Sequence, residues 1–155
     1  MDHPRIDPGV RRERLVARAR GRTLELGEPR DWLTNSDLPL HAYDTVVSVL
    51  ELCRVDDVYS ALLRVKELLA PDGQFLALEH VRATGWRGRV QDAASPAWRR
   101  VARQCHPDRD IVDVLRKNGF AITDCDRFAL DGAPPLLRQA VSVVAIRKVR
   151  NEVAS

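Results

Sequence analysis

The sequence has little cysteine, few aromatic residues and no long hydrophobic run. Of 155 residues only 3 are cysteine, and aromatic residues make up 5%. Cys53, Cys105 and Cys125 are odd in number and widely spaced, without the paired spacing of a disulfide framework or a zinc knuckle. This pattern favours a reducing compartment, and we expect the protein to be cytoplasmic.

A membrane-spanning segment and a strong charge of one sign are also missing. No apolar stretch approaches the length of a transmembrane helix, and residues 1–14 are basic without an apolar segment after them. Lysine and arginine number 25 against 22 acidic residues, a formal net charge of +3. That charge is too small to indicate a polyanion-binding surface. We therefore expect neither nucleic acid nor a membrane as a partner.

The composition that remains is that of one globular domain. With 155 residues, 45% of them hydrophobic, the chain can bury one core and is too short for two ordinary domains. We expect residues 1–155 to form a single domain.

Two apolar runs flank an amphipathic segment near the middle of the chain. Residues 43–53 and 74–81 are nearly continuous in β-branched and apolar residues, which is typical of strands buried on both faces of a parallel sheet. Between them, residues 58–69 carry apolar side chains at helical spacing, and Pro71 follows the helix. The three segments predict a βαβ unit with a right-handed crossover.

The segments on either side are shorter or less regular. The patterns predict a helix over 7–20, a short strand over 22–27, a loop over 28–42, a short helix around 96–104, a helix over 108–117, and strands over 120–130 and 138–148. The last two strands follow each other without a helix between them, so they should pair antiparallel.

Three longer stretches have sequences similar to those of a known family: LPLHAYDTVVSVLELCRVDD, LLRVKELLAPDGQFLALEHVRA and QDAASPAWRRVARQCHPDRD, followed by NGF. Together they resemble the bacterial class I S-adenosylmethionine-dependent methyltransferases, above all those related to the methyltransferase-like thiol methyltransferases. Glu79-His80-Val81-Arg82 and Cys105-His106 with Arg109 are the pieces more particular to this branch. The resemblance covers roughly residues 11 to 148.

The resemblance implies an α/β fold with a truncated Rossmann-like methyltransferase sheet. The family's strand order is 3-2-1-4-5-7-6. Here only residues 28–42 separate the first strand from the next, whereas one βαβ unit needs about thirty residues. Strands 2 and 3 therefore do not fit, and the expected order is 1-4-5-7-6 with the last strand of the chain antiparallel.

Removing two strands turns residues 22–27 into a sheet edge with exposed backbone groups. The N-terminal helix and the loop 28–42, with Trp32 and Leu33, could cover this edge within the chain. We favour the alternative, a homodimer formed across the edge.

The resemblance also implies S-adenosylmethionine as cofactor, but the glycine-rich turn that holds it in the family is missing. Gly27 is followed by Glu28-Pro29-Arg30, and no second strand supplies a ribose-binding carboxylate. We expect cofactor binding to be weak or lost. The residues that the resemblance places near the cofactor are Glu25, Gly27, Asp37, Leu38, Ser48 and Leu50.

Each candidate has a simpler explanation. Glu25 could pair with an arginine, and Asp37 could be a turn residue. His80 ends a predicted parallel strand and is the best base candidate, although a hydrogen-bonded structural histidine also fits. Cys105-His106 lacks a second pair of ligands, so no metal site is expected. Arg82 and Arg109 could bind an acidic substrate or a helix-end carboxylate.

These observations favour S-adenosylmethionine-dependent methyl transfer to an unidentified small molecule. The alternative is a non-catalytic methyltransferase remnant that acts as an interaction protein.

Overall fold

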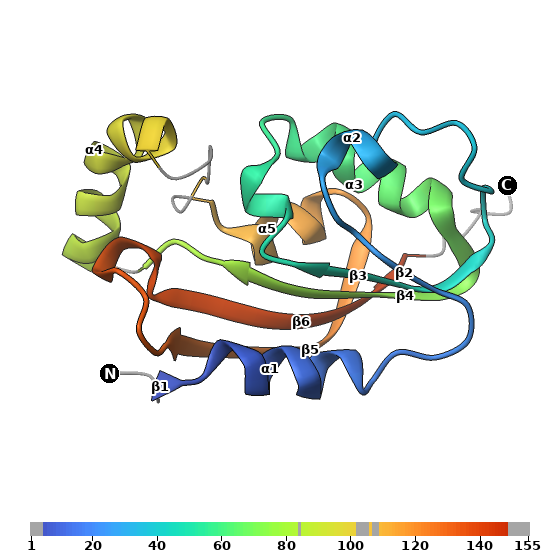
Figure 1. Ribbon diagram of the computed structural model, residues 1–155, viewed down its shortest axis with the longest axis horizontal. Coiled ribbons are helices and arrows are strands. Elements are labelled where there is room, and N and C mark those ends of the chain that lie inside the picture. Colours follow the sequence, from blue (N-terminus) through green and yellow to red (C-terminus); the bar gives the residue numbers. More distant parts are fainter. Residues whose placement is uncertain (1–4, 84, 102–105, 107–108, 149–155) are drawn as a thin grey trace, which may run out of the picture.

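The computed structural model describes residues 5–83, 85–101, 106 and 109–148. Figure 1 shows a sheet with helices on both faces and one further helix, α4, beyond one end of the sheet. The elements, in chain order, are β1 (Arg5–Ile6), α1 (Pro8–Val16), β2 (Thr23–Glu25), α2 (Pro29–Trp32), β3 (Tyr43–Val49), the 3-10 turn η1 (Leu52–Arg54), α3 (Val58–Leu68), β4 (Leu69–His80), α4 (Gly85–Val101), α5 (Ile111–Lys117), β5 (Phe120–Leu130), the 3-10 turn η2 (Pro135–Leu137) and β6 (Gln139–Arg147).

The sheet is mixed and has six strands in the order β1-β5-β6-β4-β3-β2. Strands β2, β3 and β4 are parallel, and β6 runs antiparallel to both β4 and β5. The predicted α/β, Rossmann-like class is confirmed. The predicted order of five strands was incomplete, because the two-residue β1 adds a parallel edge strand beside β5.

Side-chain alternation along the strands divides the core into two clusters. In β4, Phe75 and Ala77 belong to the larger cluster, which α2, α3 and α5 cover. Leu76 and Leu78 belong to the smaller cluster on the opposite face, where Leu15 of α1 packs. The near-continuous apolar run in β4 is explained by this burial on both faces.

Local signals in the sequence place most of the helix starts. The carboxylate of Asp57 accepts a hydrogen bond from Ser60 N at 3.0 Å and caps α3, and that of Asp110 accepts from Asp113 N at 3.2 Å and caps α5. The helix predicted around residues 96–104 is wrong in extent, because α4 begins at Gly85 and carries Pro96 inside it.

The loop predicted over residues 28–42 contains the short helix α2, which covers the end of β2. Trp32 is 2% exposed and packs into the larger cluster beside Leu26. Its indole Nε1 donates to Gly27 O at 3.2 Å, and Arg64 of α3 donates to Trp32 O at 3.2 Å. The chain thus covers the apolar side of β2 by itself. The homodimer across the β2 edge stays a prediction.

None of the helices in the described ranges has the length and apolar character needed to cross a bilayer.

Replacement of Trp32 by alanine should strongly destabilise the fold. The indole is buried, so we expect the free energy of unfolding to fall by about 3–5 kcal/mol, measured by denaturant titration. Trp86→Ala is the matched control, because Trp86 is 70% exposed, and its effect should stay within about 0.5 kcal/mol. Equal losses in the two variants would contradict the packing described for α2.

Candidate functional site

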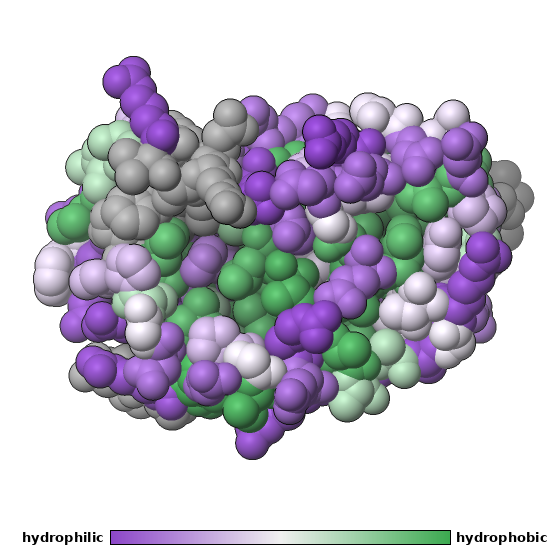
Figure 2. Space-filling view, viewed as in Figure 1, coloured by the Kyte–Doolittle hydropathy of each residue, from purple (hydrophilic) through white to green (hydrophobic). Residues whose placement is uncertain are grey.

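The parallel strands β2, β3 and β4 end at one edge of the sheet, which is where open α/β sheets bind their ligands. Val49 and Leu50, at the end of β3, are only partly buried there. Figure 2 shows hydrophobic side chains at the centre of the view, over the region where Figure 1, seen from the same side, shows β3 and β4 ending. We call this region the carboxyl edge.

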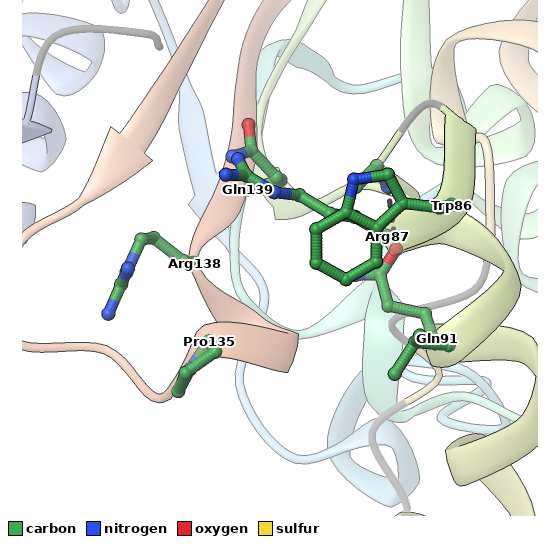
Figure 3. A pocket seen from close by; sticks show the side chains of 8 residues that line it. Trp86, Arg87, Gln91, Pro135, Arg138 and Gln139 are labelled. Carbon is green, nitrogen blue, oxygen red and sulfur yellow. Dashed lines mark hydrogen bonds between the residues drawn. The ribbon is translucent and has the colours of Figure 1, made fainter.

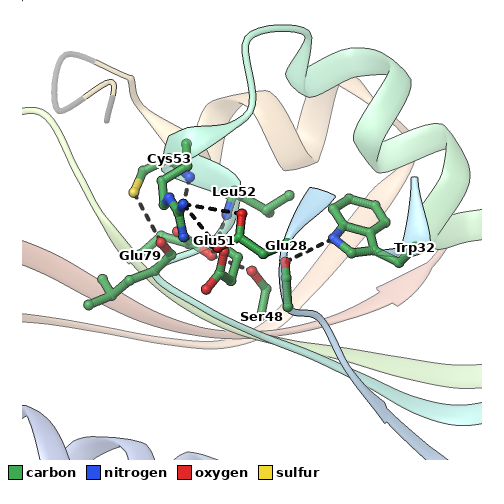
Figure 4. A network of polar contacts seen from close by, with 10 residues as sticks. Glu28, Trp32, Ser48, Glu51, Leu52, Cys53 and Glu79 are labelled. Carbon is green, nitrogen blue, oxygen red and sulfur yellow. Dashed lines mark hydrogen bonds and ion pairs between the residues drawn. The ribbon is translucent and has the colours of Figure 1, made fainter. Parts of the chain in front are cut away.

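A buried carboxylate organises the carboxyl edge. Glu79, near the end of β4, is 1% exposed. Its Oε1 accepts hydrogen bonds from Ser48 Oγ at 2.5 Å and from Leu52 N at 3.2 Å, and its Oε2 accepts from Cys53 N at 3.3 Å (Figure 4). The side chain therefore joins β4 to β3 and to η1.

Burial also changes the chemistry of this carboxyl group. Desolvation raises the pKa of Glu79 to about 7, although the hydrogen bonds from Ser48, Leu52 and Cys53 act in the opposite direction. A group with this pKa exchanges its proton near neutral pH. It is consequently a candidate for proton transfer as well as a structural anchor.

A second polar network connects η1 to α2. Arg54 Nη1 donates to Glu51 Oε2 at 3.2 Å, and Arg54 Nη2 lies 3.3 Å from Glu28 Oε1. Because Glu28 precedes α2 and Arg54 ends η1, this ion pair spans the ends of β2 and β3 (Figure 4). Burial raises the pKa of Glu51, against the lowering effect of the Arg54 charge.

The backbone is strained where β3 leaves the sheet. Leu50 has a φ of 56°, a conformation that is unfavourable for a residue with a side chain by roughly 1–2 kcal/mol. Its N–H donates to Leu78 O at 2.7 Å. Strain of this kind is concentrated at functional sites, and here it turns the chain from β3 into η1.

A histidine–aspartate pair contacts η1 through the backbone of His106. His106 is 9% exposed, and its backbone N–H donates a hydrogen bond to Cys53 O at 2.7 Å. The Nε2 atom of His106 lies 3.0 Å from Asp56 Oδ1. Arg109 donates to Leu52 O at 3.1 Å and to Asp56 O at 2.8 Å. His106 and Arg109 are thereby held against η1 and the residues that follow it.

Of the residues predicted for the cofactor, Ser48 and Leu50 lie at this edge. Glu25 does not face them: it alternates with Leu24 and Leu26, points to the α1 face and pairs with Arg12. The pairing with an arginine is the simpler explanation considered for Glu25.

Gly27 also follows β2, but its surroundings do not require a glycine. A Cβ atom at this position would meet nothing within 4 Å. The carbonyl of Gly27 is engaged by the Trp32 indole.

Asp37 and Leu38 are placed elsewhere. They lie on the segment that runs from α2 to the start of β3, at the opposite end of β3 from the carboxyl edge (Figure 1). Asp37 N donates to Asn35 Oδ1 at 2.9 Å, a local turn contact, and Leu38 packs against the larger core cluster. The structure does not bring these two residues to Ser48 and Leu50.

His80, the predicted base, points away from Glu79 because adjacent residues of a strand face opposite sides of the sheet. Burial lowers the pKa of His80 to about 4, and the hydrogen bond with the Leu137 backbone only partly offsets this. Within the described part of the chain its Nδ1 has no hydrogen-bond partner. A neutral imidazole with so low a pKa is a weak base.

Sequence reasoning missed Glu79, His106 and Asp56 as site residues. An acid inside an otherwise apolar strand is a usable signal, because a buried carboxylate needs several hydrogen-bond donors around it. The Cys105-His106 motif drew attention to His106, but Cys105 lies outside the described residues. In the ranges that the structure describes, no three His, Cys, Asp or Glu side chains are placed to hold a metal ion.

Comparison with known proteins identifies similar sequences and folds. A human thiol S-methyltransferase is 32% identical over 80 residues, which cover 50% of this chain and 33% of that protein. A methyltransferase-like protein of Bacillus halodurans superposes with a TM-score of 0.58 at 8% identity, over 76% of this chain and 69% of that one. An S-adenosylmethionine-dependent methyltransferase of Mesorhizobium loti gives 0.52 at 22% identity, over 74% and 67%.

No family model matches the sequence. The match spans about a third of the length of the human relative, and the structural likenesses concern the fold. The chain is class I methyltransferase-like: it has the Rossmann-like sheet, and half of its sequence is similar to a thiol methyltransferase.

Of the described residues near a site that S-adenosylmethionine would use, Leu50 is partly exposed at the end of β3. Ser48 is fully buried and donates to Glu79. On the side of β2, residues 28–42 form α2 and a turn segment instead of a further strand. There the Glu28–Arg54 ion pair and the buried Trp32 occupy the end of the sheet.

Glu79 and His80 should give opposite dependences of stability on pH. The pKa of Glu79 is about 7 in the folded chain against 4.5 ordinarily, so the folded state holds more protons and the free energy of unfolding falls between pH 4.5 and 7. The pKa of His80 is about 4 against 6.5, so the unfolded state holds more protons and this free energy rises between pH 4 and 6.5.

In the wild type these two pH dependences oppose each other, so substituting one residue should leave the pH dependence of the other visible. Relative to wild type, the free energy of unfolding of Glu79→Gln should rise with pH across this window, and that of His80→Gln should fall, each by up to about 3 kcal/mol. Denaturant titrations at pH 4 to 8 measure both. Parallel pH profiles in the two variants would show that these pKa values are not shifted by burial.

Proposed function

We propose that this chain is a methyltransferase-like protein that binds S-adenosylmethionine weakly at the carboxyl edge and transfers a methyl group to a small molecule. Similarity to a thiol S-methyltransferase over half the chain is the observation that supports this reaction class. A sulfur acceptor is therefore the first to test.

The cofactor, when bound, supplies a methyl group on a positively charged sulfonium, and the protein has to align donor and acceptor. The strained Leu50 would border the donor at the end of β3, and the buried Ser48 would support this end through its bond to Glu79. Glu79 keeps η1 in place through three hydrogen bonds. The apolar surface around these residues limits access of water.

A thiol acceptor must also lose its proton, because the thiolate is the nucleophile. We assign this step to His106. Asp56 at 3.0 Å orients its imidazole, and its backbone bond to Cys53 holds it against η1. His80 was the candidate from the sequence. It faces the other side of the sheet, and its low pKa makes it the weaker proposal for this role.

The alternative function, a non-catalytic interaction protein, is favoured by a different observation. The Glu28–Arg54 ion pair and Trp32 cover the ends of β2 and β3, where the family's glycine-rich turn would approach the cofactor. If the Glu28–Arg54 pair and Trp32 stay in this position, the cofactor does not bind and the folded sheet serves only as an interaction surface.

Calorimetric titration with S-adenosylmethionine and S-adenosylhomocysteine distinguishes the two functions. We expect a measurable dissociation constant larger than about 100 μM, which corresponds to a binding free energy less favourable than about −5.5 kcal/mol. The human thiol S-methyltransferase serves as the positive control. A micromolar or tighter constant would contradict weak binding, and no heat at millimolar cofactor would favour the non-catalytic alternative.

The His106→Asn variant tests the proton acceptor. With an aryl or alkyl thiol and excess cofactor at pH 7, the rate of methyl transfer should fall by about 10²-fold or more. The loss should shrink at a pH above the pKa of the thiol, because the acceptor then ionises without help. His80→Asn is the control and should retain most of the activity. If His80→Asn instead removes activity and His106→Asn does not, the roles are reversed.

A further inference from the structure

A pocket of about 270 Å³ opens between the first part of α4 and the segment that leads into β6 (Figure 3). It lies next to the carboxyl edge, because Ala83 follows the end of β4 by three residues and Val81 N donates to Gln139 O at 3.0 Å. We call it the pocket beside α4. Its apolar lining comes from Ala83, Trp86, Val90 and Pro135.

Contacts with the chain that follows β4 hold the α4 wall of this pocket in place. A Cβ atom at Gly88 would lie 2.2 Å from Ala83 O, so only glycine allows this approach. Gln91, 2% exposed, accepts a hydrogen bond from Ala83 N at 2.7 Å. Arg82 donates to both carboxylate oxygens of Asp92, at 3.0 and 2.8 Å. A ligand therefore meets a wall that is already ordered.

The α4 wall presents a flat apolar surface to this pocket. Trp86 is 70% exposed and Val90 is 47% exposed. The two residues are four positions apart on α4, so they lie on one face of the helix. Pro135, at the start of η2, adds an apolar ring from the other wall. An accessible indole beside a cavity suits a planar aromatic ligand, because two rings stack with a geometry that a puckered ring cannot adopt.

The two arginines of the lining already interact within the chain. The Arg87 guanidinium carbon lies 5.7 Å from the centre of the Trp86 ring, and Arg138 Nη2 lies 3.5 Å from Ala133 O. Figure 3 shows Arg138 extending away from Trp86. Among the described residues that line the pocket none is acidic, so two positive charges disfavour a cationic ligand. The pocket therefore favours an uncharged ligand.

One polar group of the lining is available to such a ligand. Gln139 is the first residue of β6, and Figure 3 shows it on the wall across from the helix that carries Trp86. Its backbone pairs with Val81 and Ala129. Within the part of the chain that the structure describes, its side-chain amide makes no hydrogen bond. An amide has both donors and an acceptor, so it can bind an uncharged polar substituent.

We propose that the pocket beside α4 binds a small, uncharged, planar aromatic molecule, with its ring against Trp86 and a polar substituent on the amide of Gln139. The volume is close to the lower end for small-molecule sites, about 300 Å³. The ligand is accordingly a single ring with short substituents.

This inference rests on the proposed function only where the ring is also the methyl acceptor. The ring then carries a thiol, whose sulfur forms a bond to the methyl carbon while the bond from that carbon to the sulfonium sulfur breaks. The thiol proton goes to His106, and the products are an aryl methyl thioether and S-adenosylhomocysteine. Binding of the ring itself requires no cofactor.

Benzamide and cyclohexanecarboxamide test the requirement for a flat ring, because they carry the same amide on a planar and on a puckered ring. Benzamide should bind about fivefold more tightly, with a dissociation constant on the order of 1 mM. Burial of apolar area alone would favour the saturated ring. Benzoate should bind no more tightly than benzamide, because both lining arginines already interact within the chain. Calorimetry and ligand-observed NMR on the full chain without cofactor measure all three.

Variants locate the site. Trp86→Ala should remove the preference for benzamide over cyclohexanecarboxamide, and Trp86→Phe should retain most of it. Gln139→Leu should weaken benzamide binding by about fivefold. Tyr59→Ala is the matched control, because Tyr59 is an aromatic residue of α3 that is 56% exposed and lies outside the pocket. Its affinity should stay within about twofold of wild type, and thermal unfolding should show that all four variants fold.

Each outcome supports or overturns the proposal. Equal affinity for the two amides, tighter binding of benzoate, no binding of benzamide at about 20 mM, or equal losses in Trp86→Ala and Tyr59→Ala would overturn it. If benzamide binds as expected but 4-mercaptobenzamide is not methylated with excess cofactor, the pocket stands and the proposed function fails. If 4-mercaptobenzamide is methylated with the same KM by wild type and Trp86→Ala, the function stands and the acceptor does not use this pocket.

Discussion

The hydrogen bonds that converge on Glu79 connect the parts of this protein that matter for a ligand. A carboxyl group with 1% exposure is tolerated in a sheet only because Ser48 and two backbone N–H groups of η1 donate to it. The same bonds fix η1, which in turn accepts a hydrogen bond from the backbone of His106 and carries Arg54, the partner of Glu28.

The segment after β2 covers the edge of the sheet within one chain. Only the short helix α2 lies between β2 and β3, and the apolar side of the edge is covered. Trp32 supplies the largest single piece of this cover, and Arg64 secures the segment to α3 through Trp32 O and Asn35 O. This cover packs the end of β2 against the larger core cluster.

Two adjoining surfaces share the end of β4. Glu79 is buried at the carboxyl edge, and four residues later Ala83 lines a pocket beside α4. The exposed indole of Trp86 also borders that pocket.

The sequence alone determined the βαβ unit and the antiparallel last pair, because local periodicity and the lengths of the connections decide these features. It did not determine which side chains meet. Strand alternation sends Glu25 and His80 to one face and Ser48 and Glu79 to the other, and the path along α3 takes Asp37 away from the carboxyl edge. Only the tertiary structure decided the site, because burial and facing depend on contacts between segments far apart in the chain.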